Sequence, residues 1–172
     1  IGINGFGRIG RLILRAILEN YKSKINVVAI NDLGSIETNA HLIKYDSTHG
    51  TISEDVATSK GGFKIANHNI KVFSERDPEN IPWNKVGADV ILECTGIFLD
   101  KISAAKHIKG GAKKVIISAP AKDVDFTIVQ GVNSNQLKKE HNIISNGSCT
   151  TNCLAPVAMI LEKNFGISYG YM

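Results

Sequence analysis

Three glycines near the start of the chain constrain its fold more than any other feature. Residues 1–4 have the composition of a short buried strand, and glycines stand at positions 5, 7 and 10 directly after it. Apolar residues then recur at the spacing of one helical face as far as about residue 20. In such a unit the first glycine makes a tight turn, the second lets the backbone approach a pyrophosphate, and the third lets helix and strand pack closely. The pattern therefore predicts a dinucleotide-binding unit.

An acidic residue follows at the position that binds the ribose in dinucleotide-binding units. A second strand is predicted at residues 25–30, and Asp32 comes directly after it. A carboxylate there bonds to the ribose hydroxyls and repels a 2′-phosphate. The next residues, Leu33, Gly34 and Ser35, offer no Arg or Lys to hold that phosphate. The sequence therefore predicts NAD as cofactor in preference to NADP.

Buried strands alternate with helices along most of the remaining chain. Strands are predicted at residues 90–92, 115–117, 126–129 and 143–144, and helices at residues 37–45, 101–108 and 134–139. Shorter, partly alternating apolar runs between residues 51 and 74 predict a small antiparallel insertion. This order is typical of an α/β fold with a doubly wound, mainly parallel sheet of the Rossmann type. Ligands of such sheets bind beyond the carboxyl ends of the strands, where Thr95 and Gly96 are expected to line the cleft.

A cysteine lies where the last predicted strand turns into a helix. Gly147 lets the backbone bend there, and Ser148 is a good helix N-cap. A thiol at a helix N-terminus faces unpaired N–H groups and the positive end of the helix dipole, which favour the thiolate. Cys149 is therefore predicted to be a nucleophile. Because Pro156 falls inside this helix, the pattern also allows a kink or a helix that starts one turn later.

The composition of the 172 residues indicates a globular protein of about one domain. Hydrophobic residues make up 43% of the chain, and no apolar run approaches the roughly 20 residues that a membrane helix needs. The net charge is +4, but the lysines are spread out. That distribution indicates a solvated surface rather than a nucleic-acid-binding stripe.

Three cysteines, Cys94, Cys149 and Cys153, are too few and too odd in number for a disulfide framework. We therefore expect a reducing compartment, the cytoplasm. Cys149 and Cys153 could each ligate a metal from one helix, but no other Cys or His lies near them in the sequence. No metal site is predicted. Cys94 is expected to be a buried small apolar residue rather than a reactive thiol.

Further sequence strings accompany the glycine turn, Asp32 and the cysteine turn. They occupy residues 3–11, 31–33, 44–47, 75–78, 95–96, 113–122 and 145–156. Together they resemble the N-terminal half of NAD-dependent, phosphorylating glyceraldehyde-3-phosphate dehydrogenases, and the Ser-Cys-Thr-Thr-Asn-Cys string is the most specific of them. The resemblance implies that residues 1–148 form an NAD-binding Rossmann domain. It also implies that residues 149–172 form the active-site cysteine helix and the start of a catalytic domain.

The same resemblance implies a reaction and a set of site residues. The reaction is the glycolytic oxidation and phosphorylation of glyceraldehyde 3-phosphate to 1,3-bisphosphoglycerate, with reduction of NAD and a thioester on Cys149. Ser148 and Thr150 resemble residues that hold inorganic phosphate. The residues that resemble cofactor contacts are Gly5, Gly7, Arg8, Ile9, Asp32, Arg76, Thr95, Gly96, Phe98, Ser118 and Ala119. The assembly that the resemblance implies is a homotetramer.

The family's base histidine has no counterpart among the five histidines of the chain. By the resemblance it would follow Met172, together with residues that hold the substrate phosphate. We therefore expect a fragment that binds NAD and is inactive alone. Three alternatives stay open: an erythrose-4-phosphate dehydrogenase, which shares the cysteine string; a non-catalytic NAD-binding module; and a redox sensor in which Cys149 bridges to Cys153.

Overall fold

The computed structural model describes residues 1–172. The strands are β1 (Gly2–Asn4), β2 (Ala29–Asn31), β3 (Tyr45–Asp46), β4 (Gly50–Thr51), β5 (Val56–Ser59), β6 (Gly62–Ile65), β7 (His68–Phe73), β8 (Val90–Glu93), β9 (Lys114–Ile117), β10 (Phe126–Thr127) and β11 (Ile143–Ser145). The α-helices are α1 (Arg8–Asn20), α2 (Ile36–Lys44), α3 (Lys101–Ala104), α4 (Lys106–Lys109) and α5 (Cys149–Phe165). The 3-10 helices are η1 (Pro78–Asn80), η2 (Trp83–Val86) and η3 (Ser134–Gln136).

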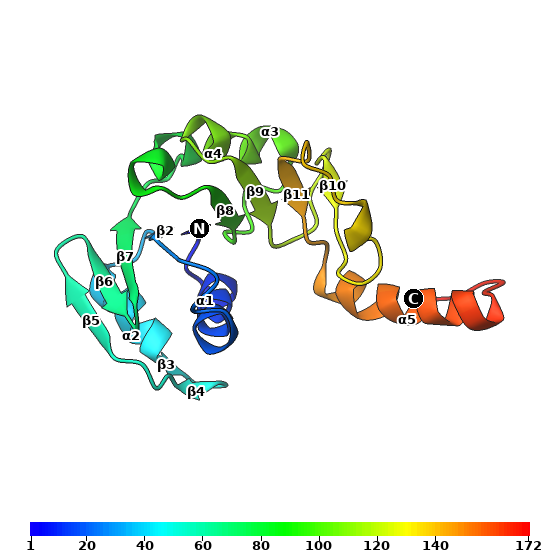
Figure 1. Ribbon diagram of the computed structural model, residues 1–172, viewed down its shortest axis with the longest axis horizontal. Helices are drawn as coiled ribbons and strands as arrows, with labels where there is room; N and C mark the ends of the chain where they lie inside the picture. The colour runs from blue at the N-terminus through cyan, green and yellow to red at the C-terminus, as the bar shows by residue number, and fades with distance from the viewer.

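Nine strands form one sheet in the order β10-β11-β9-β8-β1-β2-β7-β6-β5 (Figure 1). Every pair from β10 to β7 is parallel, and only β6 and β5 are paired antiparallel at one edge. The prediction of a doubly wound, mainly parallel sheet with a small antiparallel insertion is confirmed. Strand β1 is flanked by β2 on one side and by β8 on the other, so the strand order reverses there. Doubly wound sheets bind ligands in the crevice outside the carboxyl ends of strands at such a reversal.

Apolar residues pack on both faces of this sheet, because neighbouring residues of a strand point to opposite sides. Ile30 of β2 belongs to one buried cluster, with Leu14 of α1 and Ile43 of α2. Its neighbour Ala29 belongs to another cluster, with Trp83 of η2. Both faces are therefore covered, and the carboxyl edge of the sheet is left to form a site.

The first half of the chain follows the predicted elements closely. The helix expected at residues 37–45 is α2, shifted by one residue. The strand expected at residues 25–30 is wrong in extent, because it pairs with β1 only from Ala29 to Asn31. Residues before Ala29 still contribute to the core, since Val27 is fully buried. The apolar run was therefore a sign of burial and not of sheet pairing along its whole length.

Two helices of the second half are shorter than predicted. The helix expected at residues 101–108 is broken at Ala105 into α3 and α4, where the Ala105 N–H is shared between the carbonyls of Lys101 and Ser103. The helix expected at residues 134–139 is only the single turn η3. There the side chain of Asn133 bonds back to the preceding loop, accepting from the Val129 N–H and donating to the Thr127 carbonyl.

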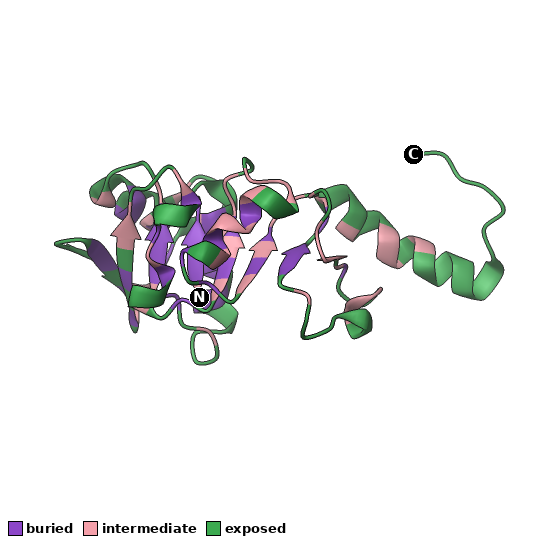
Figure 2. Ribbon diagram, turned by 90° about the horizontal axis from the view of Figure 1, so that it is seen from above, coloured by how far each residue is buried: buried purple, intermediate pink, exposed green.

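Helix α5 begins at Cys149 and runs to Phe165 with Pro156 inside it. The alternative of a helix that starts one turn later is therefore wrong. The helix extends away from the sheet, as Figures 1 and 2 show, and none of its residues is buried. Its apolar residues keep the predicted spacing, but the side chains of Leu154, Val157 and Phe165 are exposed.

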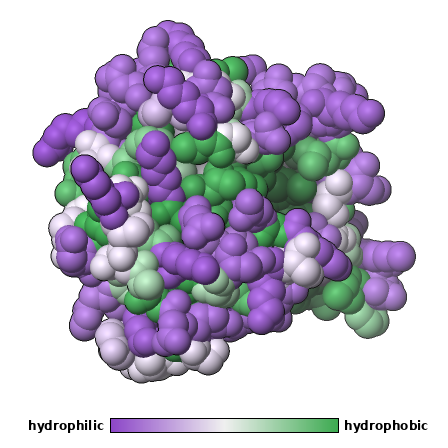
Figure 3. All heavy atoms as spheres, turned by 60° about the vertical axis from the view of Figure 1, so that its left-hand side comes forward, coloured by the Kyte–Doolittle hydropathy of each residue, from purple (hydrophilic) through white to green (hydrophobic).

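One face of the molecule is mostly hydrophilic (Figure 3). On the face drawn in Figure 3, hydrophilic side chains cover most of the surface and apolar residues show in the hollows between them. None of the helices has both the length and the apolar character that crossing a membrane requires.

Candidate functional site

A cleft of about 410 Å³ lies at the carboxyl ends of β1, β2 and β8. Among the residues lining it are these predicted cofactor contacts: Gly5, Gly7, Asp32, Arg76, Thr95 and Phe98. The lining also contains residues outside the predicted set: Asn4, Asn31, Leu33, Glu75, Cys94 and Ile97. Asn4 and Asn31 are the last residues of buried strands, and a polar residue in that place was the signal available in the sequence.

The glycine turn forms one wall of the cleft. Gly5 has φ +86°, and a Cβ there would lie 2.7 Å from the Thr95 nitrogen; a Cβ on Gly10 would lie 2.2 Å from the Gly5 oxygen. These two glycines are therefore required by the fold itself. A Cβ on Gly7 would meet no atom within 4 Å, and Gly7 is the N-cap residue of α1, which has no side-chain cap. An open backbone at a helix N-terminus fits a bound diphosphate.

Three other predicted cofactor contacts, Arg8, Ile9 and Gly96, do not line the cleft but are close in sequence to residues that do. Arg8 and Ile9 form the exposed first turn of α1, directly after Gly7. Gly96 is exposed and stands between Thr95 and Ile97, which both line the cleft.

The Asp32 carboxylate ties the end of β2 to the glycine turn. Its Oδ2 accepts the Phe6 N–H at 2.8 Å, and its Oδ1 accepts the Gly34 N–H at 2.8 Å. A carboxylate oxygen can accept more than one hydrogen bond, so both oxygens keep capacity for the hydroxyls of a ribose. Asp32 is only partly buried, which leaves this capacity open to the cleft.

The strand order sets out the remaining predicted residues along the same edge of the sheet. Ser118 and Ala119 follow β9, which pairs with β8. Cys149 follows β11, which pairs with β9. Because all these strands are parallel, their carboxyl ends lie along one edge of the sheet. Along this edge the cleft comes first, Ser118 and Ala119 come next, and Cys149 follows.

The turn before Cys149 is held by its own polar side chains. Gly147 has φ +67°, and the Ser148 hydroxyl accepts the Thr151 N–H at 2.9 Å, so the predicted bend and N-cap are both present. The Asn152 amide donates to the carbonyls of Asn146 and Ser148 at 2.7 and 2.9 Å. Cys149 is thereby fixed as the first residue of α5, with an exposed side chain.

The residues directly before and after Cys149 both carry a hydroxyl group. The Ser148 and Thr150 oxygens are 2.9 Å apart and lie on the residues before and after Cys149. Because both belong to the first turn of the helix, they stand beside its N–H groups. Hydroxyl and N–H donors of this kind are suited to an anionic group.

Ser145 joins the cysteine turn to the loop after β9, and the sequence did not single it out. The side chain is fully buried at the end of β11. Its hydroxyl donates to the Ala119 carbonyl at 2.8 Å and accepts the Gly147 N–H at 3.0 Å. One hydroxyl therefore links the predicted cofactor loop to the predicted nucleophile turn.

The three thiols differ in their surroundings. Cys149 and Cys153 are exposed, whereas Cys94 lies partly buried in the cleft. Burial raises the pKa of the Cys94 thiol to about 11, although a hydrogen bond with Ser118 acts in the opposite direction. Cys94 therefore stays a protonated thiol at neutral pH.

Alkylation with iodoacetamide at about pH 8 is expected to modify Cys149 and Cys153 and to leave Cys94 unmodified, because only a thiolate reacts readily. Mass spectrometry of the proteolytic peptides measures the three rates separately. If Cys94 were modified as fast as Cys153, the Cys94 thiol would not be shielded by burial in the cleft.

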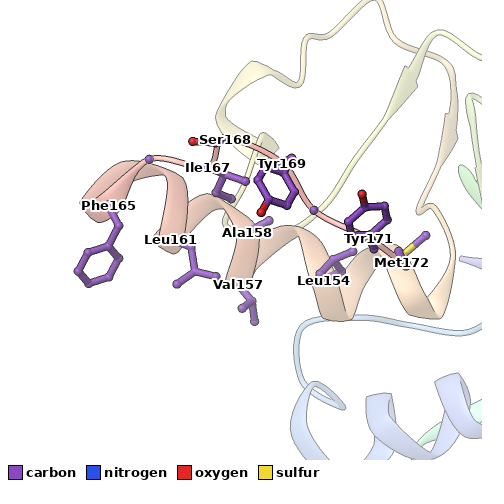
Figure 4. A pocket seen from close by; sticks show the side chains of 12 residues that line it. Leu154, Val157, Ala158, Leu161, Phe165, Ile167, Ser168, Tyr169, Tyr171 and Met172 are labelled. Carbon is purple, nitrogen blue, oxygen red and sulfur yellow. The ribbon is translucent and has the colours of Figure 1, made fainter.

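A larger cavity, of about 660 Å³, lies between α5 and the segment that follows it. Figure 4 shows Leu154, Val157 and Leu161 on the helix, with Tyr169 and Tyr171 on the following segment. The lining is mostly apolar and contains none of the predicted site residues. The predicted site residues therefore all lie outside this cavity.

Comparison with known proteins assigns the chain to a family. The family model described as "Glyceraldehyde 3-phosphate dehydrogenase, NAD binding domain" matches residues 1–101. The model described as "Glyceraldehyde 3-phosphate dehydrogenase, C-terminal domain" matches residues 148–172.

Curated relatives match over the whole chain. Glyceraldehyde-3-phosphate dehydrogenases from Streptomyces coelicolor and Geobacillus stearothermophilus are each 53% identical over 100% of the chain, which is 51% of each relative. Glyceraldehyde-3-phosphate dehydrogenase 1 from Bacillus cereus is 52% identical over the same share. The chain spans about half the length of the curated relatives it matches. The chain therefore belongs to the glyceraldehyde-3-phosphate dehydrogenase family, a family of oxidoreductases, and its N-terminal part matches the domain that binds the cofactor NAD.

Proposed function

We propose that the protein carrying this chain oxidises glyceraldehyde 3-phosphate and phosphorylates the product to 1,3-bisphosphoglycerate, with Cys149 as the nucleophile. The observation that carries this proposal is the order of sites along one sheet edge. The NAD cleft ends at β8, Ser118 and Ala119 follow at β9, and Cys149 follows at β11. A substrate bound to the thiol would therefore lie beside a cofactor that extends from the cleft past β9.

Different residues of the chain would contact different parts of the cofactor. The open backbone at Gly7 and the first turn of α1, with Arg8 and Ile9, would hold the diphosphate. Asp32 would hold the ribose hydroxyls through its free lone pairs. The other contacts proposed for NAD are Gly5, Arg76, Thr95, Gly96, Phe98, Ser118 and Ala119. Bound NAD supplies an acceptor for hydride.

The cysteine turn would carry the covalent chemistry. The Cys149 sulfur attacks the aldehyde carbon, so that a C–S bond forms and the carbonyl oxygen becomes an alkoxide. N–H donors of the turn would stabilise that oxygen. When the carbon loses its hydride, for which bound NAD would be the acceptor, the alkoxide oxygen re-forms the C=O bond and an acyl group remains on sulfur as a thioester. An oxygen of inorganic phosphate, held by Ser148 and Thr150, then attacks the acyl carbon, and the thiolate leaves with the C–S electron pair.

We propose that the chain divides at residues 148 and 149, into an NAD-binding domain and the start of a catalytic domain. The match of residues 148–172 to the C-terminal family model supports this division. A cytoplasmic homotetramer that uses glyceraldehyde 3-phosphate and inorganic phosphate belongs to the same proposal.

The proposal can be tested in a chimera, in which this chain replaces the matching half of the Geobacillus stearothermophilus relative. We expect the chimera to form NADH from glyceraldehyde 3-phosphate, and its steady turnover to require inorganic phosphate. A chimera that folds and binds NAD but forms no NADH would contradict the catalytic role and leave a binding module. The aldehyde is tested on the natural protein that carries this chain, where a preference for erythrose 4-phosphate would contradict the proposed substrate.

Replacing Asp32 by asparagine is expected to weaken NAD binding by the chimera about tenfold or more, because hydrogen bonds to a charged group contribute roughly 1.5–3 kcal/mol. Binding of NADP should not weaken, because the repulsion of its 2′-phosphate is removed as well. Calorimetric titration with both cofactors measures the ratio. Asp55→Asn is the matched control, since the Asp55 side chain is fully exposed beside Lys44. An unchanged ratio of the two affinities in Asp32→Asn would count against the role of Asp32.

A further inference from the structure

A row of buried polar side chains crosses the sheet directly beneath the NAD cleft. Its members, which we call the polar row, are Trp83, His107, Glu93, Asn4 and Asn31, and each is at most 5% exposed. Glu93, Asn4 and Asn31 are the last residues of the neighbouring strands β8, β1 and β2. Asn4 and Asn31 also line the cleft. The row therefore runs along the carboxyl edge that binds the cofactor.

The hydrogen bonds of His107 assign its protons. The indole Nε1 of Trp83 can only donate, and it lies 3.0 Å from His107 Nδ1. Nδ1 is therefore the accepting nitrogen. His107 Nε2, 2.9 Å from the Glu93 Oε2, then carries the hydrogen and donates it to the carboxylate.

Every other partner of the Glu93 carboxyl group can also donate a hydrogen bond to it. Oε2 accepts from the Asn4 amide at 2.6 Å, and Oε1 accepts from the Thr95 N–H at 2.8 Å. Oε1 is also bonded to the Thr95 hydroxyl, which in turn accepts the Ile97 N–H at 3.1 Å. The Thr95 hydroxyl can therefore donate its own hydrogen to Glu93 while it accepts the Ile97 N–H. As a carboxylate, Glu93 can accept from all four of these groups, and the four hydrogen bonds compensate its burial.

The chain of hydrogen bonds continues from Asn4 through Asn31 to Glu75, on the opposite side of the cleft from Thr95. The Asn4 oxygen accepts from the Asn31 amide at 2.8 Å. Asn31 also brackets the main chain of Glu75, donating to its carbonyl at 2.9 Å and accepting its N–H at 2.8 Å. These bonds are satisfied by only one orientation of the Asn4 amide and one of the Asn31 amide. The direction of every hydrogen bond from Glu93 to the segment that carries Arg76 is therefore set.

We propose that Glu93 is a positioning residue of the NAD cleft. Its carboxylate fixes the turn at residues 95–97 directly and, through Asn4 and Asn31, the segment at Glu75 and Arg76. The cleft walls on β8 and beside β7 are thereby held at the spacing that binds the cofactor. This role rests on NAD binding alone and not on the proposed chemistry at Cys149.

Replacing Glu93 by glutamine tests the role, because the amide has the same shape but points two N–H groups at donors. We expect the dissociation constant of NAD, measured by calorimetry on the chimera, to rise about tenfold, because unpaired buried donors distort the turn. The rate of Cys149 alkylation without NAD should stay unchanged. That second measurement separates a failure of the cleft from a failure of the cysteine chemistry.

Moving the carboxylate from position 93 to position 4 tests whether NAD affinity depends on the hydrogen bonds of the polar row or only on the stability of the fold. In the double variant Asn4→Asp and Glu93→Gln, the new carboxylate can accept from the glutamine amide and from Asn31. His107 Nε2 is already 3.5 Å from the Asn4 amide nitrogen, so it can donate there as well. We expect the double variant to recover most of the NAD affinity, whereas Asn4→Asp alone loses affinity because two carboxylates then adjoin.

Val115→Ala is the control for stability, since Val115 is fully buried on β9 and takes no part in the row. It should lower the melting temperature without changing the NAD dissociation constant. Wild-type NAD affinity in Glu93→Gln would overturn the proposal. So would a double variant that binds NAD no better than Glu93→Gln, or a Val115→Ala variant that loses as much affinity.

Discussion

Replacing Cys149 by serine is expected to lower NADH formation by the chimera by about 10⁴-fold or more, the scale of loss when a catalytic nucleophile is removed. A serine hydroxyl is a far weaker nucleophile than a thiolate, so the acyl intermediate cannot form at a useful rate. The substitution changes one exposed atom at the start of α5 and leaves the N-cap and the Asn152 contacts in place. NAD affinity and melting temperature should therefore stay close to those of the unchanged chimera.

Cys153→Ser is the matched control for this loss. Cys153 is exposed on the same helix, one turn beyond Cys149, but it lies inside α5 and not at its N-terminus. We expect this variant to keep most of the NADH formation. Equal losses in the two variants would favour a paired redox role of the cysteines, and a Cys149→Ser variant with near-normal activity would rule out Cys149 as the nucleophile.

Replacing Gly7 by alanine is expected to weaken NAD binding by about tenfold or more while leaving the fold intact. A Cβ at Gly7 would meet no protein atom within 4 Å, and its φ of −71° is open to any residue. The methyl group would instead occupy the place where the backbone is expected to approach the diphosphate. The loss of a close N–H contact to a charged group accounts for an effect of about this size.

Two other glycines provide the contrast for this experiment. Gly10→Ala should lower the melting temperature, because its Cβ would lie 2.2 Å from the Gly5 carbonyl oxygen. Gly170→Ala should change neither stability nor NAD affinity, since a Cβ there meets nothing and lies far from the cleft in sequence and fold. If Gly7→Ala bound NAD normally, the cofactor would not lie against the glycine turn.

The sequence was sufficient to predict the local chain geometry around the candidate site. The glycine turn, Asp32 and the helix N-terminus at Cys149 each lie within a few residues of a strand end. Their neighbours along the chain therefore reveal the bend or the cap. The strand alternation likewise predicted the doubly wound sheet, because buried strands and amphipathic helices have distinct periods.

The polar row and the Ser145 bridge could not be predicted in the same way. Glu93 and Asn4 are 89 residues apart, and they meet only because β8 and β1 are paired in register. Ser145 reaches Ala119 only because β11 pairs with β9. A single polar residue at the end of an apolar strand shows that something is bonded there, but the partner is set by the strand order.

Helix α5 shows a different limit of the sequence. Its apolar spacing correctly predicted a helix, yet none of its residues is buried. Periodicity indicates which residues share a face, and it cannot tell whether another part of the protein covers that face. The sequence therefore predicted the element and its N-cap but not its surroundings.

The central claim, a thioester on Cys149 formed with NAD bound in the cleft, is tested most directly by trapping the acyl group. The chimera is mixed with NAD and glyceraldehyde 3-phosphate in the absence of inorganic phosphate, quenched in acid and digested for mass spectrometry. We expect one burst of NADH and an acyl adduct on the peptide that contains Cys149, and we expect added phosphate to remove the adduct and start steady turnover. NADH formation without an adduct, or an adduct on another residue, would contradict the claim.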